Sequence, residues 1–397
     1  MNWLKQTIAV MSVNLRTIPS RLGSSAVAII GIAGVVIVFV SVLSIAAGFA
    51  AAMTGSGSPD RALILRTGAD TELTSGIEGP QIRIIKEAPG VRKEGEGASA
   101  SAELYVIIDL PKKAIPDSPA NVPMRGIEPL GLKVREEVSL IEGRPFRFGT
   151  NEVIVGKGAQ SQFVGLNVGD TVVSGQNRWS VVGVFQARGG LAETEIWCDV
   201  QTLQSVYRRV NSFNSVLMNL ESSDSFDTLR SWLESNPQTK NVTVRRESDY
   251  YAKQGETMSR LINTLGFGVA TLMAVGAVFG AILTMYTAVA SRSREIATLR
   301  ALGFNTLSVV VSVLVESLVL GAIGGVIGAI GAYLAFDGFQ TSTMNFQSFS
   351  QVAFAFRVTP QLFATGLAYA LAIGLIGGLL PAIRAARLPI SRALREL

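Results

Sequence analysis

The chain has 397 residues, of which 48% are hydrophobic and only 16% charged, and its formal net charge is +5. This composition favours a membrane protein over a soluble enzyme. Histidine is absent and there is one cysteine, Cys198, which excludes a Ser-His-Asp centre, a His-ligated zinc, a disulfide within the chain and a Cys-rich metal site.

The N-terminal segment, 1–22, is predicted to be an amphipathic helix that lies along the cytoplasmic face of a membrane, in contact with lipid. Its apolar side chains recur at intervals of three and four residues, which places them on one helical face: Leu4, Ile8, Met11, Leu15 and Ile18. Pro19 is expected to end this helix before the next segment begins.

Four segments are apolar enough to cross a membrane core, which needs about 20 residues. These segments are 23–52, 259–290, 305–336 and 359–383. No charge lies between Arg21 and Asp60 or between Arg260 and Arg292, and the third segment holds one charged residue, Glu316. The first segment could instead be a cleavable signal peptide, but its apolar run is about twice as long as a signal-peptide core, which favours a retained span.

Basic residues flank the four spans on one side and predict the orientation of the chain. The N-terminal segment, the loop 291–304 and the tail 384–397 each carry more Lys and Arg than Asp and Glu. These segments, with both termini, are therefore expected in the cytoplasm, and 53–258 and 337–358 outside it. Residues 51–258 contain 23 Lys and Arg against 26 Asp and Glu, so the basic excess lies beside the spans and does not indicate nucleic-acid binding.

The segment 53–258 is too long for a loop and is predicted to be an extracytoplasmic α+β domain inserted between the first and second spans. Apolar patterns predict strands at 62–66, 104–110, 152–155, 178–185, 195–198, 215–220 and 242–246. Helical spacing predicts helices at 157–163, 200–207 and 225–235. Stretches rich in Gly, Pro and Ser predict loops at 55–59, 90–101 and 111–123. The last helix is predicted to start at Ser248 and to continue unbroken into the second span.

The inserted segment carries no recognisable catalytic or nucleotide-binding motif. Gly156-Lys157-Gly158 resembles the end of a phosphate-binding loop, but Asn151 and Gly158 replace its first glycine and its Ser or Thr. Acidic residues at 193–195 and 221–227 lack the spacing of a calcium loop and are predicted to be solvated surface. No metal or cofactor is therefore expected in this chain, which disfavours a membrane-anchored enzyme.

The loop 291–304 is predicted to form a short amphipathic helix at the cytoplasmic face. Its apolar residues Ile296, Leu299 and Leu302 recur every three residues, and Gly303 is placed to end the helix. The charged residues around them are Arg292, Arg294, Glu295 and Arg300. The same pattern is typical of a positive anchor that only fixes the topology, and the pattern alone does not choose between the two.

The third span carries a set of glycines and a single carboxylate. The glycines are spaced so that another helix can approach closely: Gly321, Gly324, Gly325, Gly328 and Gly331. Glu316 lies about ten residues into the span, near mid-membrane at a rise of about 1.5 Å per residue. Two interpretations remain open: a functional intramembrane carboxylate, or a structural group that is protonated or hydrogen-bonded to Ser or Thr on a facing helix.

Residues 284–336 resemble the membrane region of MacB/FtsX-type ABC transporter permeases. The similarity is carried by Arg294-Glu295-Ile296, Leu299-Arg300-Ala301-Leu302-Gly303, Glu316-Ser317 and the glycines that follow. The tail is similar too, through 381–389 and Ala393-Leu394-Arg395. In the inserted segment, 152–156, 165–170 and 181–185 resemble the periplasmic core domain of the family, whereas 60–150 is covered weakly.

The resemblance implies a homodimer in the cytoplasmic (inner) membrane of a bacterium, driven by a separate cytoplasmic ABC ATPase subunit that binds ATP and magnesium. The loop 291–304 would be the coupling helix that docks on this ATPase. Its candidate contact residues are Arg292, Arg294, Glu295, Ile296, Leu299, Arg300, Leu302 and Gly303. Motion would then pass to the extracytoplasmic domain, for export or extraction of a substrate with a periplasmic adaptor as a further partner.

A second hypothesis within the same family is an FtsX-like regulator that does not transport but activates a cell-wall hydrolase outside the membrane. The larger MacB proteins fuse the ATPase to the N-terminus, whereas this chain starts almost at its first helix. The resemblance therefore implies that the ATPase partner is encoded separately.

Overall fold

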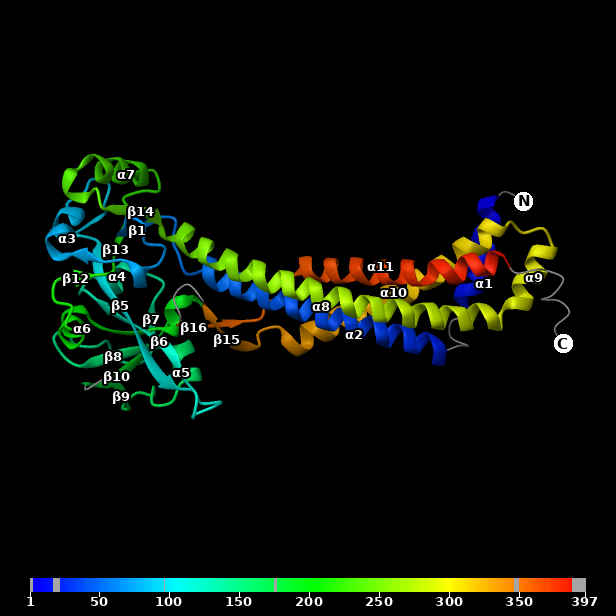
Figure 1. The fold of residues 1–397 in the computed structure, drawn as a ribbon, viewed down its shortest axis with the longest axis horizontal. Helices are drawn as coiled ribbons and strands as arrows, with labels where there is room; N and C mark the ends of the chain where they lie inside the picture. The colour runs from blue at the N-terminus through cyan, green and yellow to red at the C-terminus, as the bar shows by residue number, and fades with distance from the viewer. Residues whose placement is uncertain (1–2, 17–21, 96, 175–176, 346–349, 388–397) are drawn as a thin grey trace. The chain divides into compact units, whose positions relative to one another are not determined.

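The computed structural model describes residues 3–16, 22–95, 97–174, 177–345 and 350–387 (Figure 1). Its packing separates a helical unit, made of 1–47, 260–339 and 356–397, from an inserted domain, made of 48–259 and 340–355. The predicted features of the C-terminal tail at 388–397 and the predicted helix end at Pro19 lie outside the described residues.

Four helices of the described chain are long and apolar enough to cross a membrane. They are α2 (Leu22–Thr54), α8 (Glu247–Ser291), α10 (Thr306–Phe336) and α11 (Pro360–Ala386). The inserted domain follows α2 and precedes α8 in the sequence, so the predicted fold class is confirmed. A helix is favoured in such apolar runs because lipid offers no hydrogen bonds, and a helix satisfies its backbone N–H and C=O groups internally.

Capping side chains mark where two of these helices begin. The side chain of Asn305 accepts a hydrogen bond from the Leu307 backbone N–H at 3.1 Å, ahead of α10. The hydroxyl of Thr359 accepts one from the Leu362 N–H at 3.3 Å, ahead of α11. Two shorter helices belong to the same unit, α1 (Trp3–Arg16) and α9 (Ser293–Ala301), and both lie at one end of the helix bundle (Figure 1).

The inserted domain is built on a mixed sheet whose ten described strands run in the order β14-β1-β13-β5-β6-β11-β8-β10-β7, with β9 paired to β10. The long strand β5 (Ala100–Pro111) pairs with β13 through 100–103 and with β6 through 104–111, so it divides the sheet into two lobes. Lobe A contains β1 (Arg61–Arg66), β13 (Ser215–Asn219) and β14 (Val242–Arg246). Lobe B contains β6 (Pro119–Ile127), β7 (Ser139–Gly143), β8 (Glu152–Gly156), β9 (Thr171–Ser174), β10 (Asn177–Gln186) and β11 (Ile196–Asp199).

Helices cover one face of the sheet in each lobe. Those of lobe A are α3 (Gly79–Lys86) and α7 (Ser225–Ser235), and those of lobe B are α5 (Lys157–Gln162) and α6 (Val200–Val206) (Figure 1). In β5 the even-numbered side chains enter the two cores, Ala102 in lobe A and Val106 in lobe B, because successive side chains of a strand point to opposite faces. The odd-numbered Glu103 is buried on the other face.

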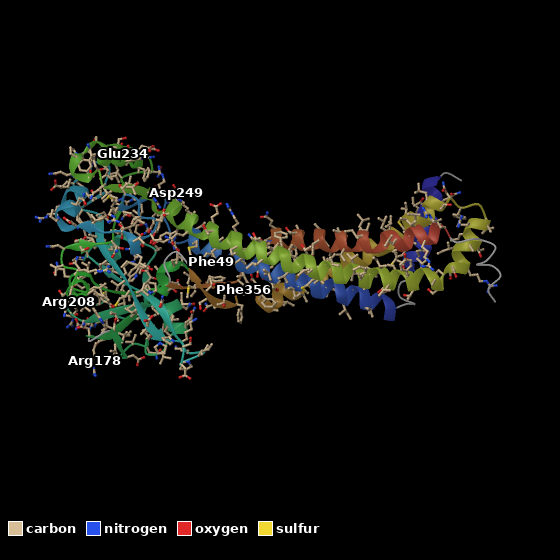
Figure 2. The ribbon with its side chains drawn as sticks, in the orientation of Figure 1. Phe49, Arg178, Arg208, Glu234, Asp249 and Phe356 are labelled. Atoms are coloured by element: carbon tan, nitrogen blue, oxygen red, sulfur yellow. The ribbon has the colours of Figure 1, made fainter. Side chains whose placement is uncertain are left out.

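Short elements complete the inserted domain. They are η2 (Glu72–Thr74), β2 (Ile77–Glu78), β3 (Lys93–Glu94), β4 (Gly97–Ala98), α4 (Gly131–Val134), η3 (Leu191–Thr194), β12 (Ser212–Phe213) and η4 (Pro237–Thr239). The surface of the domain is charged, and Figure 2 shows Arg178, Arg208 and Glu234 on it.

Two of the predicted loops contain strands. β6 begins at Pro119, inside the predicted loop 111–123, and β3 and β4 lie inside 90–101. Proline and glycine indicated loops there because they weaken strands locally. β6 nevertheless pairs with β5 from Pro119 to Gly126, and this pairing outweighs the local composition.

The predicted outer loop 337–358 contains a β-hairpin that packs with the inserted domain. β15 (Gln340–Asn345) pairs antiparallel with β16 (Ser350–Ala355). The ring of Phe354 is buried and lies 5.5 Å from that of Phe49, centroid to centroid, in an edge-to-face arrangement. The segment is therefore part of a folded domain, which its short and partly polar sequence did not indicate.

Candidate functional site

α9 follows α8 directly but is a separate helix. α8 ends at Ser291, Arg292 has φ −114° and ψ 10°, and α9 begins at Ser293. At its other end Gly303 has φ +90°, a left-handed conformation that glycine adopts at little cost. The predicted short helix is therefore present, over nine residues of the loop 291–304.

The predicted contact residues of this segment are divided between two sides. Ile296 is 7% exposed and packs inside the helical unit. The exposed members of the set are Arg294, Glu295, Leu302 and Gly303, and the half-buried members are Leu299 and Arg300. Leu302 is 72% exposed beyond the end of α9, so the apolar residues spaced by three do not form one buried face.

Arg292 lies inside the helical unit, where it forms an ion pair with Glu316. Its Nη1 is 3.2 Å from Oε2 of Glu316, and the two side chains are 4% and 6% exposed. Its Nη2 also lies 3.5 Å from the backbone oxygen of Asn14. The interpretation of Glu316 as a group held by Ser or Thr of a facing helix therefore missed its charged partner, because the partner comes from the segment after α8 and not from a span.

α1 packs on α10 through a face that the sequence pattern did not indicate. The hydroxyl of Thr7 donates to that of Ser308 at 3.0 Å, and the side-chain amide of Asn14 donates to the hydroxyl of Ser312. Val10, between them on the same face, is 4% exposed. Ile8, a member of the predicted apolar face, is 56% exposed, which suits a side chain in contact with lipid.

The glycines of α10 lie against two other helices, α11 and α2. A methyl group on Gly321 would lie 2.9 Å from the backbone oxygen of Ala370 in α11, and Gly325 faces the same helix. On the adjacent side the close neighbours are in α2: Ile29 for Gly324, Ala33 for Gly328 and Ile37 for Gly331. Absence of a side chain lets both backbones approach closely. The predicted single stripe is therefore two stripes, one for each partner helix.

Gly328→Leu is expected to lower the free energy of unfolding by about 1–3 kcal/mol, as for other overpacked interiors. A methyl group there would lie 2.7 Å from the Ala33 backbone oxygen, so α2 and α10 must separate. The matched control is Gly276→Leu in α8, where no atom lies within 4 Å of the added group. Thermal unfolding in detergent measures both variants, and equal stability of the two would contradict the predicted contact.

The first turn of α8 is held in the inserted domain by ion pairs and a hydrogen bond. Arg61 Nε lies 2.5 Å from Oε2 of Glu247, the first residue of α8, and Arg61 Nη1 lies 2.7 Å from Glu137. One turn further, the hydroxyl of Tyr250 accepts a hydrogen bond from the Glu72 backbone N–H at 3.0 Å. α8 is thus fixed to the sheet at its beginning.

Beside this anchor, Arg125 is buried among three carboxylates. Its guanidinium lies 2.7 Å from each of Glu72, Glu103 and Glu195, with the Arg125 side chain 2% exposed. The prediction that the acidic residues at 193–195 are solvated is therefore wrong for Glu195, which is 5% exposed. The four charged residues come from four separate segments, so their proximity has no signal in the local sequence.

A second buried arginine shares one of these carboxylates. Arg135 Nη1 lies 2.6 Å from Glu103 Oε1, while Arg125 binds the other oxygen of the same group. Burial by itself raises the pKa of the Glu103 carboxyl, but the guanidinium groups of Arg135 and Arg125 outweigh it and lower this pKa to about 2. The carboxylate is therefore ionised at neutral pH.

The inserted domain is expected to lose stability as the pH falls from about 4.5 to about 2. The folded pKa of Glu103 lies below its reference value of 4.5, so the stabilisation is complete above the reference value and is lost toward the folded value. Fluorescence of the buried Trp179 and Trp197 reports unfolding. Glu103→Gln should unfold at a lower temperature at neutral pH and show a smaller acid-induced decrease; an unchanged decrease would contradict this.

Comparison with known families covers both units. The MacB-like periplasmic core domain family matches residues 25–236, more than half of the chain, and the FtsX-like permease C-terminal family matches 267–390. This chain belongs to the MacB/FtsX-type ABC transporter permeases. The permease is a multi-pass membrane protein of this family.

Curated relatives of the permease are longer proteins. It is 24% identical over 369 residues to the macrolide export ATP-binding/permease protein MacB of Hyphomonas neptunium, a match that covers 82% of this chain and 54% of the relative. It is 26% identical over 282 residues to MacB 1/2 of Paracoccus denitrificans, covering 65% of this chain and 40% of the relative. The chain thus spans about half the length of the curated relatives it matches.

Two solved structures are also similar to part of the chain. The periplasmic region of MacB from Actinobacillus actinomycetemcomitans matches with a TM-score of 0.37 and 14% identity, over 51% of this chain and 94% of that one. The extracellular domain of the noncanonic ABC-type transporter YknZ from Gram-positive bacteria matches with a TM-score of 0.35 and 19% identity, over 47% and 99%.

Proposed function

We propose that this permease transmits ATP-driven motion of a cytoplasmic ABC ATPase subunit to its inserted domain outside the membrane. The observation that carries the proposal is the continuity of α8. This single helix of 45 residues, about 68 Å long at about 1.5 Å per residue, begins at the ion-paired Glu247 and ends at Ser291, directly before α9. A continuous helix fixed at its beginning can pass a displacement of its end to the domain that holds it.

α9 is the proposed docking element for the ATPase. Its exposed Arg294 and the exposed Leu302 just after its end offer a charged and an apolar contact beside the membrane, and the basic flanks of the spans predict that this side faces the cytoplasm. Arg292 is buried, so its role in the proposal changes from an ATPase contact to a residue that holds α9 against α10. ATP and magnesium belong to the ATPase.

The proposal includes the arrangement that the family resemblance implies. Two copies of the permease form a homodimer in the cytoplasmic membrane of a bacterium, surrounded by lipid, with both termini in the cytoplasm. The inserted domains act on a substrate outside the bilayer, for export or extraction, with a periplasmic adaptor as a candidate partner. The relatives named as ATP-binding/permease proteins support an ATPase as the source of motion.

Arg294→Glu combined with Leu302→Asp tests the docking surface. Association with a co-expressed cognate ABC ATPase should weaken by about tenfold or more, because both contacts lie on the exposed side of the segment, and ATPase stimulation should fall with it. The measurements are co-purification and the ATPase rate of the complex.

The matched control is Arg178→Glu combined with Val173→Asp, an exposed pair on neighbouring strands of the inserted domain, of which Arg178 is labelled in Figure 2. It replaces an arginine and an exposed aliphatic residue with the same acidic residues and should leave association intact. Undiminished association and ATPase rate in the α9 variant would refute the proposed contact.

A further inference from the structure

A cavity of about 310 Å³ lies behind α9, within the helical unit. Its walls come from α1, the last turns of α8, α9 and the first turns of α10. This volume is at the lower end of ligand pockets, which measure about 300–1,000 Å³, and about twice that of an engineered apolar cavity of about 150 Å³ that binds benzene. The cavity is therefore large enough for a small organic molecule.

The lining of the cavity is apolar on most sides. Each of the four helices contributes: Val10 from α1, Val289 from α8, Ile296 from α9 and Val313 from α10. These four side chains are each less than 9% exposed, so they form buried walls of the cavity. Such a lining favours an apolar ligand body.

Charged groups converge at one side of the same cavity. The Arg292–Glu316 ion pair lines it, at 3.2 Å between the charged atoms, and Glu295 of α9 lines it as well. One guanidinium against two carboxylates gives the lining a net charge of −1. Complementarity therefore disfavours an anionic ligand and favours one with a single positive charge.

We propose that this cavity binds a small amphiphile with an apolar body and one cationic group, such as a hydrophobic amine. The apolar body contacts Val289 and Ile296, and the cation lies near Glu295. A bound molecule would touch both α8 and α9 and so hold the two helices in one relative position. Arg294 and Leu302, proposed above for ATPase docking, do not line the cavity. Binding of the amphiphile can therefore be tested without the ATPase.

1-Naphthylmethylamine, a small hydrophobic amine that is cationic at neutral pH, is the probe, and its fluorescence anisotropy with the purified full chain in detergent is the measurement. Saturable binding above that of empty micelles is expected. Ala288→Phe, which fills the cavity from α8, and Glu295→Gln, which removes the net charge, should each weaken binding by about tenfold or more. Glu295 is exposed, so its variant tests the proposal even if Ala288→Phe fails to fold.

The matched controls introduce the same residues, Phe and Gln, at positions outside the cavity. Leu283→Phe adds an aromatic ring to an exposed position of α8, and Arg294→Gln removes a charge from a residue of α9 that does not line the cavity; both should bind the probe within about threefold of wild type. The proposal is overturned by the absence of a saturable component, by wild-type affinity in both cavity variants, or by equal affinity for the anionic 1-naphthalenesulfonate.

Discussion

Replacing Arg125 with methionine is expected to destabilise the inserted domain by about 3–5 kcal/mol, enough to unfold a marginal domain. The substitution leaves Glu72, Glu103 and Glu195 buried together without the guanidinium that lies 2.7 Å from each of them. Uncompensated charge in a low-dielectric interior costs far more than an exposed pair contributes, because water cannot replace the lost partner.

Arg144→Met is the matched control for this prediction. Arg144 also pairs with a carboxylate at 2.7 Å, that of Glu152, but its side chain is 44% exposed. Its loss should cost far less than the loss of Arg125, since exposed ion pairs contribute little. Chemical denaturation of the full chain, followed by fluorescence of the buried Trp179 and Trp197, measures both variants. Similar losses in the two would show that burial does not determine the cost.

A combined variant separates the loss of the ion pairs from the cost of leaving buried carboxylates without a counter-charge. Arg125→Met together with Glu72→Gln and Glu195→Gln removes the arginine and neutralises two of its three partners, while Glu103 keeps Arg135 at 2.6 Å. The triple variant should therefore be more stable than Arg125→Met alone, although each added substitution removes a native interaction. A further loss of stability would mean that the hydrogen bonds of these carboxylates matter more than their charge.

The spans and the long α8 could be predicted from the sequence because their signal is local. A charge-free run of about 20 residues has one favourable structure in lipid. The strands of lobes A and B were also largely predictable from alternating apolar residues. β6, β7 and the β-hairpin of 340–355 were not predicted, since their local sequence has no strand pattern and their stability comes from pairing with neighbouring strands and from packing in the inserted domain.

Buried charges were the main feature that the sequence did not reveal. Arg125, Glu195 and Arg292 belong to residue types that are mostly found in solvent, so composition favours an exposed position for each. Burial follows only when the fold brings opposite charges together, and the partners of Arg292 and Arg125 lie at separations such as 24 and 70 residues. Arg292 was thus predicted to contact an ATPase, whereas the structure places it against Glu316.

Buried ion pairs lie at both ends of α8. Arg61 pairs with Glu247 where this helix begins, and Arg292 pairs with Glu316 directly after it ends. If α8 transmits motion as proposed, a displacement of α9 strains the Arg292–Glu316 pair first. Transmission is then expected in discrete steps, because packed and ion-paired elements change between two arrangements and do not deform continuously.

Breaking the Arg292–Glu316 pair from either side should cost about 3–5 kcal/mol, and removing both partners should cost clearly less than the sum. Arg292→Leu leaves a carboxylate, and Glu316→Leu leaves a guanidinium, in a site where the side chains are 4% and 6% exposed. The double variant leaves no charge of this pair in the apolar interior, so part of the stability returns.

Thermal unfolding in detergent for the four members of this cycle gives the coupling between the two residues. If the pair also transmits motion, the stable double variant should still associate with the ATPase through α9 but show reduced stimulation of its activity. Strictly additive losses would mean that the two groups interact too weakly to hold α9. Normal stimulation in the double variant would leave the pair a purely structural role, with transmission carried by the apolar contacts of Ile296 against α10.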